Sequence, residues 1–154
     1  MTLKIGEAVP DFSAPSTGGQ FRLSEARGAP LLIYFYPKDN TSGCTAESLD
    51  FAQAHDRFAQ ARTRIIGVSR DSMKSHEGFK QKLQLPFELV SDPDEHLCKL
   101  FGVIKNKTMY GKPVRGIERS TFLLDGQGAL RHEWRGVKVP GHVEQALAAA
   151  RALG

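Results

Sequence analysis

The sequence predicts an α/β fold in which helices flank a mixed central β-sheet, with a β-hairpin as an N-terminal extension. The continuous apolar run Leu31–Tyr36 is typical of a strand buried on both faces of a parallel sheet, and Arg64–Ser69, with the sequence RIIGVS, is interpreted as a second buried strand. The segment between them has helical spacing, so the three elements form a β-α-β unit with a right-handed crossover. A turn at residues 125–128 indicates a later antiparallel hairpin. Parallel and antiparallel strands therefore belong to one sheet.

Length and composition favour one soluble domain covering residues 1–154, with 40% hydrophobic and 25% charged residues. No apolar stretch approaches the ~18 residues that span a bilayer, and the N-terminus lacks the pattern of a signal peptide. These features predict a cytoplasmic protein with no membrane partner. The net charge is +4, but the basic residues are spread along the chain, so we expect no nucleic-acid partner. The one modest basic group is Lys105, Lys107, Lys112 and Arg115.

The first half of the chain is expected to fold as a hairpin followed by alternating strands and helices. Turn residues dominate up to Gly28, and Gly18-Gly19 marks the tip of the hairpin. A helix is expected over about residues 44–61, because apolar residues there recur at helical spacing. A polar helix follows over about 73–84, and Pro86 ends it. The apolar stripe of the first helix consists of Phe51, Ala54, Phe58 and Ala61.

The second half begins with a short strand, residues 87–90, and a short helix. For this helix we expect Asp92 as the N-cap, followed by Pro at the first position and Glu at the third, with Gly102 at the end. A loop rich in Gly and Lys comes next. The elements expected after the loop are a strand at 121–124, the turn at 125–128, a strand at 129–134 and a final amphipathic helix carrying Val143, Ala146, Leu147, Ala150 and Leu153.

Cys44, one of only two cysteines, lies just past the Leu31–Tyr36 strand and in the first turn of the following helix. Open α/β sheets place ligands at this end of their strands. The amides and dipole of a helix N-terminus stabilise anions, including the reactive thiolate form of cysteine. The alternative is a buried, inert cysteine. Because residues 39–43 are loop and capping residues rather than core residues, a reactive thiol fits this setting better.

Three separate blocks of sequence support a family resemblance. They are YFYPKDNTSGCT at 34–45, SDPDEHLCKLFGV at 91–103 and YGKPVRGIERSTFLLDGQG at 110–128. In order and spacing they resemble the peroxiredoxins, and among these the bacterioferritin comigratory protein (Q-type) branch. The resemblance runs from about Gly6 to the C-terminal helix. It implies a thioredoxin-like fold, and reduction of hydrogen peroxide and organic hydroperoxides by a cysteine, with no metal, haem or flavin cofactor.

The resemblance also implies roles for four residues. Cys44 matches the peroxidatic nucleophile, and Thr41 offers a hydroxyl to the thiolate or the peroxide. Pro37 would shield the thiolate from water, and Arg119 would stabilise the thiolate and polarise the substrate oxygens. Each has a plainer alternative: a helix N-cap for Thr41, strand termination for Pro37 and a solvated strand end for Arg119.

Two further residues are weaker candidates near this site. Arg115 competes with Arg119 as the active-site arginine, and Glu47 is placed to orient the arginine from the first turn of the helix. A plain helix-dipole acid is the other interpretation of Glu47. The histidines show no zinc-ligand spacing with either cysteine, so we expect no metal site and solvated or partly buried structural roles for them. They are His55, His76, His96, His132 and His142.

The chain departs from the family pattern in its second cysteine. Many members carry a resolving cysteine five residues after the first, where this chain has Leu49, and others carry it in the next helix, which here has none. Cys98 is the remaining candidate, but its short helix is not the expected resolving location. We therefore predict a one-cysteine mechanism in which an external thiol reduces the sulfenic acid: thioredoxin, glutathione with glutaredoxin, or another small thiol. A two-cysteine mechanism through Cys98 is the alternative.

Two other classes of function compete with a peroxidase. A thioredoxin-type disulfide oxidoreductase requires a Cys-x-x-Cys pair, and here Thr41 stands three residues before Cys44. A peroxide sensor or holdase acting through oxidation of Cys44 differs by reacting once instead of turning over. We also expect the protein to be a monomer.

Overall fold

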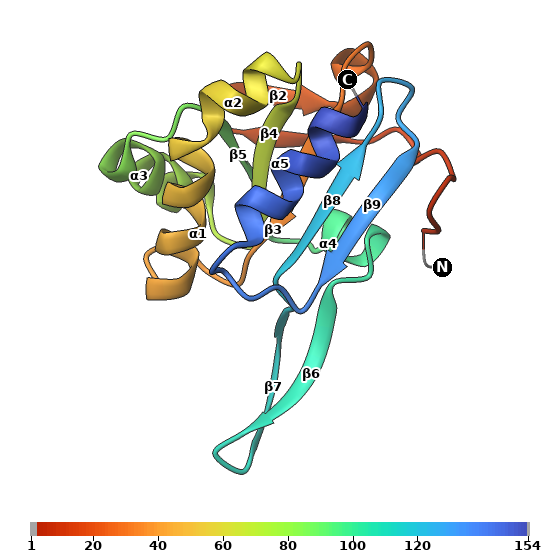
Figure 1. The fold of residues 1–154 in the computed structure, drawn as a ribbon. Coiled ribbons are helices and arrows are strands. Elements are labelled where there is room, and N and C mark those ends of the chain that lie inside the picture. Colours follow the sequence, from red (N-terminus) through yellow and green to blue (C-terminus); the bar gives the residue numbers. More distant parts are fainter. Residues whose placement is uncertain (1–2, 154) are drawn as a thin grey trace.

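The computed structural model describes residues 3–153 and shows a central sheet with helices packed against it (Figure 1). In chain order the elements are β1 Ser13–Ser16, β2 Gly19–Arg22, the 3-10 helix η1 Leu23–Ala26, β3 Leu31–Phe35, α1 Ser42–Gln53, α2 His55–Gln60, β4 Arg64–Ser69, α3 Met73–Leu83, β5 Glu88–Ser91, α4 His96–Leu100, β6 Ile104–Met109, β7 Lys112–Ile117, β8 Ser120–Leu124, β9 Leu130–Arg135 and α5 His142–Leu153.

The main sheet has seven strands in the order β2-β1-β5-β4-β3-β8-β9. β3, β4 and β5 are parallel, while β8 and β9 on one side and β1 and β2 on the other pair antiparallel. The predicted mixed sheet and the N-terminal hairpin are both confirmed. The ends of the strands predicted with bounds agree with the observed ones to within one residue.

β3 lies at the centre of the molecule, and all five of its residues are buried. Successive side chains of a strand point to opposite faces, and here the two sets belong to two separate apolar clusters. Ile33 and Phe35 pack into one cluster, and Leu32 and Tyr34 into the other. Helices α1, α2, α3 and α5 supply the second cluster and α4 supplies the first, so the sheet separates the two (Figure 1).

The helix expected over 44–61 is two helices, α1 and α2, separated at Ala54. The ψ angle of Ala54 is 0°, well away from the helical value of about −42°. Phe51 and Phe58 are nevertheless both buried in the same cluster. No glycine or proline marks this break, so the sequence pattern alone shows one continuous helix.

The capping prediction at Asp92 is wrong in position. Helix α4 starts four residues later, at His96, after Glu95 adopts a left-handed φ of 62°. The Asp92 carboxylate still accepts hydrogen bonds from the helix amides of Leu97 and Cys98, at 3.1 and 2.8 Å. Glu95 does not close a capping box, because its carboxylate binds Arg70 and Arg115 instead. The helix ends as predicted, with Gly102 left-handed at φ 66°.

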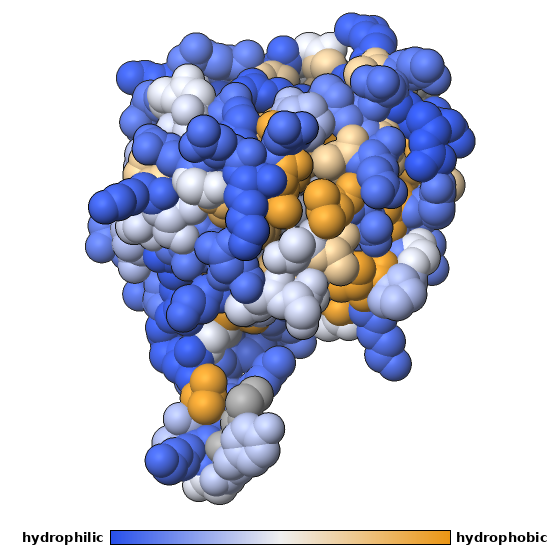
Figure 2. All heavy atoms as spheres, turned by 90° about the vertical axis from the view of Figure 1, so that its left-hand side faces the viewer, coloured by the Kyte–Doolittle hydropathy of each residue, from blue (hydrophilic) through white to orange (hydrophobic). Residues whose placement is uncertain are grey.

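The Gly- and Lys-rich segment predicted as a loop is a second sheet, the hairpin β6–β7. It projects away from the body, and its surface is mostly hydrophilic (Figures 1 and 2). Tyr110 and Gly111 form the turn with positive φ angles of 53° and 77°. Most side chains of the hairpin are exposed on both faces, so the alternation of apolar and polar residues that marks a half-buried strand is missing.

Within residues 3–153, no helix combines the length and the apolarity needed to cross a membrane.

Candidate active site

Cys44 is the third residue of α1 and lies beyond the carboxyl end of β3, as predicted. Its side chain is only 1% exposed and packs into the apolar cluster that α1 shares with α5. The thiol thus combines a dry environment with the amide-rich first turn of a helix. The helix amides favour an anion at the sulfur, whereas the apolar surroundings exclude water and by themselves disfavour the charged form.

Arg119 reaches the cysteine from the position just before β8, the strand that pairs antiparallel with β3. β8 begins at Ser120, which lies opposite Phe35, the last residue of β3. This register brings the residue before β8 to the end of β3, where the cysteine loop starts. The Nη2 group of Arg119 donates to the Cys44 sulfur at 3.3 Å. A Cβ on Gly43 would lie 3.1 Å from the same Nη2, so glycine gives the guanidinium room.

Glu47 holds the other side of the guanidinium. Nη1 of Arg119 donates to its Oε1 at 2.7 Å, and the two residues form an ion pair in which the carboxylate is fully buried. The second oxygen, Oε2, has no hydrogen-bond partner within the described part of the chain. Burial raises the pKa of Glu47 to about 7, although the charge and hydrogen bond of Arg119 lower it. The arginine therefore lies between a sulfur and a carboxylate.

This raised pKa predicts a pH effect on stability. Glu47 ionises near pH 4.5 when unfolded and near pH 7 when folded, so the native state binds more protons in between. Its contribution to stability is present below pH 4.5 and falls by roughly 3 kcal/mol as the pH rises through 7. We expect Glu47→Gln to remove this fall. Urea unfolding of both proteins at pH 5 and pH 8 measures it, with the exposed Glu144→Gln as control, and equal pH dependence in parent and Glu47→Gln would contradict the assignment.

Thr41 and Pro37 flank the site without touching the sulfur. The Thr41 hydroxyl donates to the carbonyl of Lys38 at 2.8 Å. Thr41 does stand at the N-cap position, but its side chain accepts no helix amide, so the predicted side-chain cap is wrong. The hydroxyl is already engaged by the loop itself. Pro37 is exposed in the bend after the strand.

Arg115 is not part of this cluster. It lies on the projecting hairpin and pairs with Glu95. Arg119, which contacts the cysteine, and Arg115, which pairs with Glu95, are four residues apart in the sequence but have different roles.

Cys98 and Cys44 lie on opposite faces of the central sheet. Cys98 is fully buried on α4, in the cluster on the opposite face of the sheet from Cys44. Burial first, and then the neighbouring Asp92, raises the pKa of its thiol strongly. Both cysteines are free. A disulfide between them requires Cα atoms within ~7 Å, and the central sheet stands between the two.

Two histidines are more buried than predicted. Nε2 of His142 forms a hydrogen bond with Oγ1 of Thr121 at 2.8 Å. Burial, and after it the positive charge of Arg119, lowers the pKa of His142 to about 4. His76 is completely buried and contacts Asp39 in the loop before Cys44. The sequence pattern does not indicate this pair, since the residues are 37 positions apart. One feature could have suggested it: Asp39 follows β3 and His76 follows β4, and these two strands are parallel neighbours.

The fold and the buried cysteine–arginine pair define a peroxiredoxin-type α/β protein. The sequence profile of the AhpC/TSA family matches residues 5–133, so the chain belongs to that family.

Individual relatives agree with this assignment. The chain is 52% identical to Peroxiredoxin Bcp of Xanthomonas campestris (97% of this chain, 94% of the relative) and 47% identical to Peroxiredoxin Bcp of Bacillus subtilis (96% and 94%). It superposes with a TM-score of 0.90, at 51% identity, on the bacterioferritin comigratory protein of Xanthomonas campestris, over 97% of this chain and 96% of the other. The predicted thioredoxin-like fold and the predicted Bcp (Q-type) branch are confirmed.

Proposed function

We propose that the protein is a thiol-dependent peroxidase that reduces hydrogen peroxide and organic hydroperoxides through Cys44. The observation that carries the proposal is the Arg119 guanidinium held between the Cys44 sulfur at 3.3 Å and the Glu47 carboxylate at 2.7 Å. The structure of the Xanthomonas campestris relative was described in connection with alkyl peroxide reduction. Similarity at this level supports the same substrate class here.

In the proposed reaction the Cys44 thiolate attacks one peroxide oxygen. The O–O bond breaks, the sulfur is oxidised by two electrons to a sulfenic acid, and the other oxygen leaves as water or alcohol after taking a proton. Arg119 stabilises the thiolate before attack and the charge that develops on the leaving oxygen. Thr41 and Pro37 border the substrate position, with Pro37 as a shield against water. The Thr41 hydroxyl donates to the peroxide after it gives up its hydrogen bond to the Lys38 carbonyl.

The sulfenic acid is resolved by an external thiol. Within this chain position 49 is leucine, α3 carries no cysteine and Cys98 lies across the sheet. A first thiol condenses with the sulfenic acid to a mixed disulfide and water, and a second thiol releases Cys44 and forms the external disulfide. Thioredoxin, or glutathione with glutaredoxin, supplies these thiols. In this proposal the protein works in the cytoplasm as a single-domain monomer.

Mass spectrometry of protein treated with one equivalent of peroxide tests the one-cysteine mechanism. We expect a sulfenic acid on Cys44, or a mixed disulfide when a small thiol is present, and steady turnover with an added reductant system. The Cys98→Ser variant should show the same products and the same turnover. An intramolecular Cys44–Cys98 disulfide in the parent would support the two-cysteine alternative instead.

The same experiment separates a peroxidase from a peroxide sensor or holdase. A sensor consumes one equivalent of peroxide and stops, whereas a peroxidase continues as long as the reductant lasts. Consumption limited to one equivalent with each of the thioredoxin and glutaredoxin systems would overturn the proposed function.

A further inference from the structure

The loop between β3 and α1 is anchored by a single side chain. Of residues 37–42, only Asp39 is buried. Its Oδ1 accepts from the Tyr36 hydroxyl at 2.6 Å, and its Oδ2 accepts from Ser75 Oγ at 2.8 Å. Its backbone amide donates to Asp71 at 2.9 Å. The loop that leads into the cysteine helix is therefore held at one point, against α3 and the loop before it.

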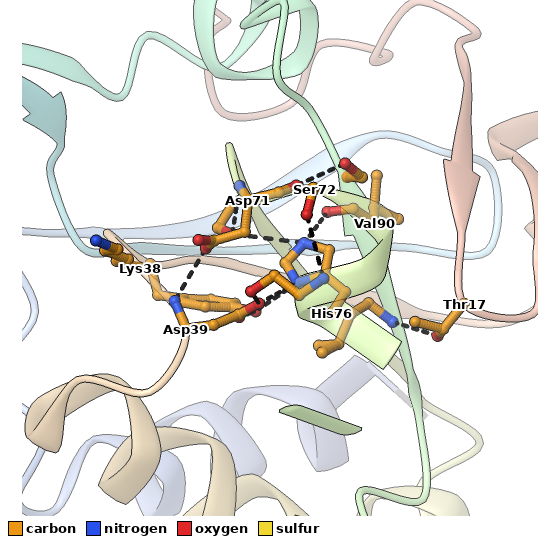
Figure 3. Close-up of polar contacts among 12 residues, drawn as sticks. Thr17, Lys38, Asp39, Asp71, Ser72, His76 and Val90 are labelled. Atoms are coloured by element: carbon orange, nitrogen blue, oxygen red, sulfur yellow. Dashed lines mark hydrogen bonds and ion pairs between the residues drawn. The ribbon is translucent and has the colours of Figure 1, made fainter. Parts of the chain in front are cut away.

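His76 completes this anchor from within α3 (Figure 3). Its Nδ1 lies 2.8 Å from Asp39 Oδ2 and its Nε2 lies 3.0 Å from the carbonyl oxygen of Val90. A carboxylate and a carbonyl accept hydrogen bonds but do not donate them. Nδ1 therefore donates to the ionised carboxylate of Asp39, and Nε2 faces the Val90 carbonyl and, at 3.4 Å, the hydroxyl of Ser69. Burial raises the pKa of Asp39, but the hydrogen bonds of His76 and Tyr36 lower it more.

The same groups have the composition of a metal site, but their hydrogen bonds assign them differently. Potential ligand atoms of Asp39, Asp71 and His76 lie within 4.8 Å of one another. Both ring nitrogens of His76 are already engaged by protein groups, Nδ1 by Asp39 and Nε2 by the Val90 carbonyl. Asp71 Oδ2 is engaged by the amide of Asp39 at 2.9 Å and by Ser69 Oγ at 2.5 Å. The cluster is therefore a satisfied polar network that joins three segments of chain.

The position of this network matters because of what must reach Cys44. Cys44 as a whole is 1% exposed, which suits a small peroxide but not the thiol of a protein or a tripeptide. In the proposed one-cysteine mechanism such a thiol must attack the sulfenic sulfur directly. Access then requires the first turn of α1 to move, and the loop in front of it is the segment held only by Asp39.

We propose that the Asp39–His76 pair is a latch, a positioning pair that keeps residues 37–41 and the first turn of α1 in place and sets how readily they open to admit the reducing thiol. This inference rests on the proposed function for its purpose, but the latch itself is a property of the fold. Opening separates the buried Asp39 carboxylate from its hydrogen-bond donor on His76, so removing either partner shifts the opening equilibrium by about 10- to 100-fold.

Alkylation of Cys44 by reagents of two sizes measures the opening. The proteins are the Cys98→Ser parent, the same chain with His76→Gln, with Asp39→Asn and with both changes. Iodoacetamide reports access by a small molecule, and a maleimide on a polyethylene glycol chain reports access by a large one. We expect the large-to-small rate ratio to rise about 10-fold or more in each single variant. The double variant should add little, because either change already breaks the pair.

A core variant on the opposite face controls for general loss of stability. Leu130→Ala creates a cavity in the other apolar cluster and touches neither the loop nor α3. Its thermal midpoint, measured by circular dichroism, is matched with those of the latch variants. An unchanged ratio in His76→Gln and Asp39→Asn would overturn the latch, and so would an equal rise in Leu130→Ala.

The kinetics provide a readout that a purely structural role would not give. The latch variants should react more slowly with peroxide, since Cys44 is less well placed, while reduction of their sulfenic acid by a protein thiol becomes faster. A structural defect lowers both rates together, and that result would contradict the proposal. If the parent shows no peroxide turnover, the proposed function fails while the alkylation ratios still decide the latch.

Discussion

The Cys44→Ser variant is expected to lose peroxide reduction entirely, by at least about 10³-fold, because no other group in the site can act as the nucleophile. A serine hydroxyl does not ionise near neutral pH, and Arg119 alone cannot cleave the O–O bond. The change replaces sulfur by oxygen in a buried position, so the fold should survive. The measurement is consumption of hydrogen peroxide and an organic hydroperoxide with a thiol reductant present.

Cys98→Ser is the matched control for this loss, since it makes the same chemical change in the only other cysteine. It should retain the turnover of the parent. Residual peroxidase activity in Cys44→Ser, lost only when Cys98 is also replaced, would show that the second thiol is a nucleophile. That outcome would remove the basis for placing the chemistry at the N-terminus of α1.

The core of the fold was predictable because its strands are buried on both faces. For that reason Leu31–Phe35 is an unbroken apolar run in the sequence. Once this strand is recognised, the helical segment after it and the strand Arg64–Ser69 complete a β-α-β unit. The hairpin β6–β7 was not predictable in the same way, because it packs against little and lacks a periodic apolar pattern. Asp92 does accept hydrogen bonds from amides of α4, as the capping prediction requires. The helix starts later than predicted, and the Glu95 side chain binds Arg70 and Arg115, two residues distant in sequence, instead of closing a capping box.

The site shows a similar division. A cysteine at a strand-to-helix junction is a local signal, so the position of Cys44 could be predicted from residues near it. The choice of Arg119 over Arg115 came from family resemblance, and the register of β8 against β3 now gives its physical basis. The His76–Asp39 contact joins helix α3 to the loop before α1 through the tertiary fold, and no spacing in the sequence indicates it.

Arg119→Met is expected to lower the rate constant for peroxide reduction by about 10²- to 10³-fold, the usual effect of removing one preorganised donor from a developing negative charge. Methionine keeps much of the volume but donates nothing to the sulfur or to the peroxide. Alkylation of Cys44 at pH 7 should slow as well, since the guanidinium no longer stabilises the thiolate. Arg119→Lys should recover only part of both rates, because a single ammonium cannot bridge the sulfur and Glu47 as a planar fork does.

The same substitution removes the ion-pair partner of the buried Glu47 carboxylate, so its effects on stability and on catalysis can be measured separately. Breaking a buried pair costs several kcal/mol when one charge remains, and Glu47 avoids part of this by keeping its proton to higher pH. Adding Glu47→Gln to Arg119→Met removes the stranded acid, so the double variant should be more stable than Arg119→Met at pH 8 and equally slow with peroxide. Recovery of the rate along with the stability would mean that Arg119 supports the fold of the site and takes no part in the reaction.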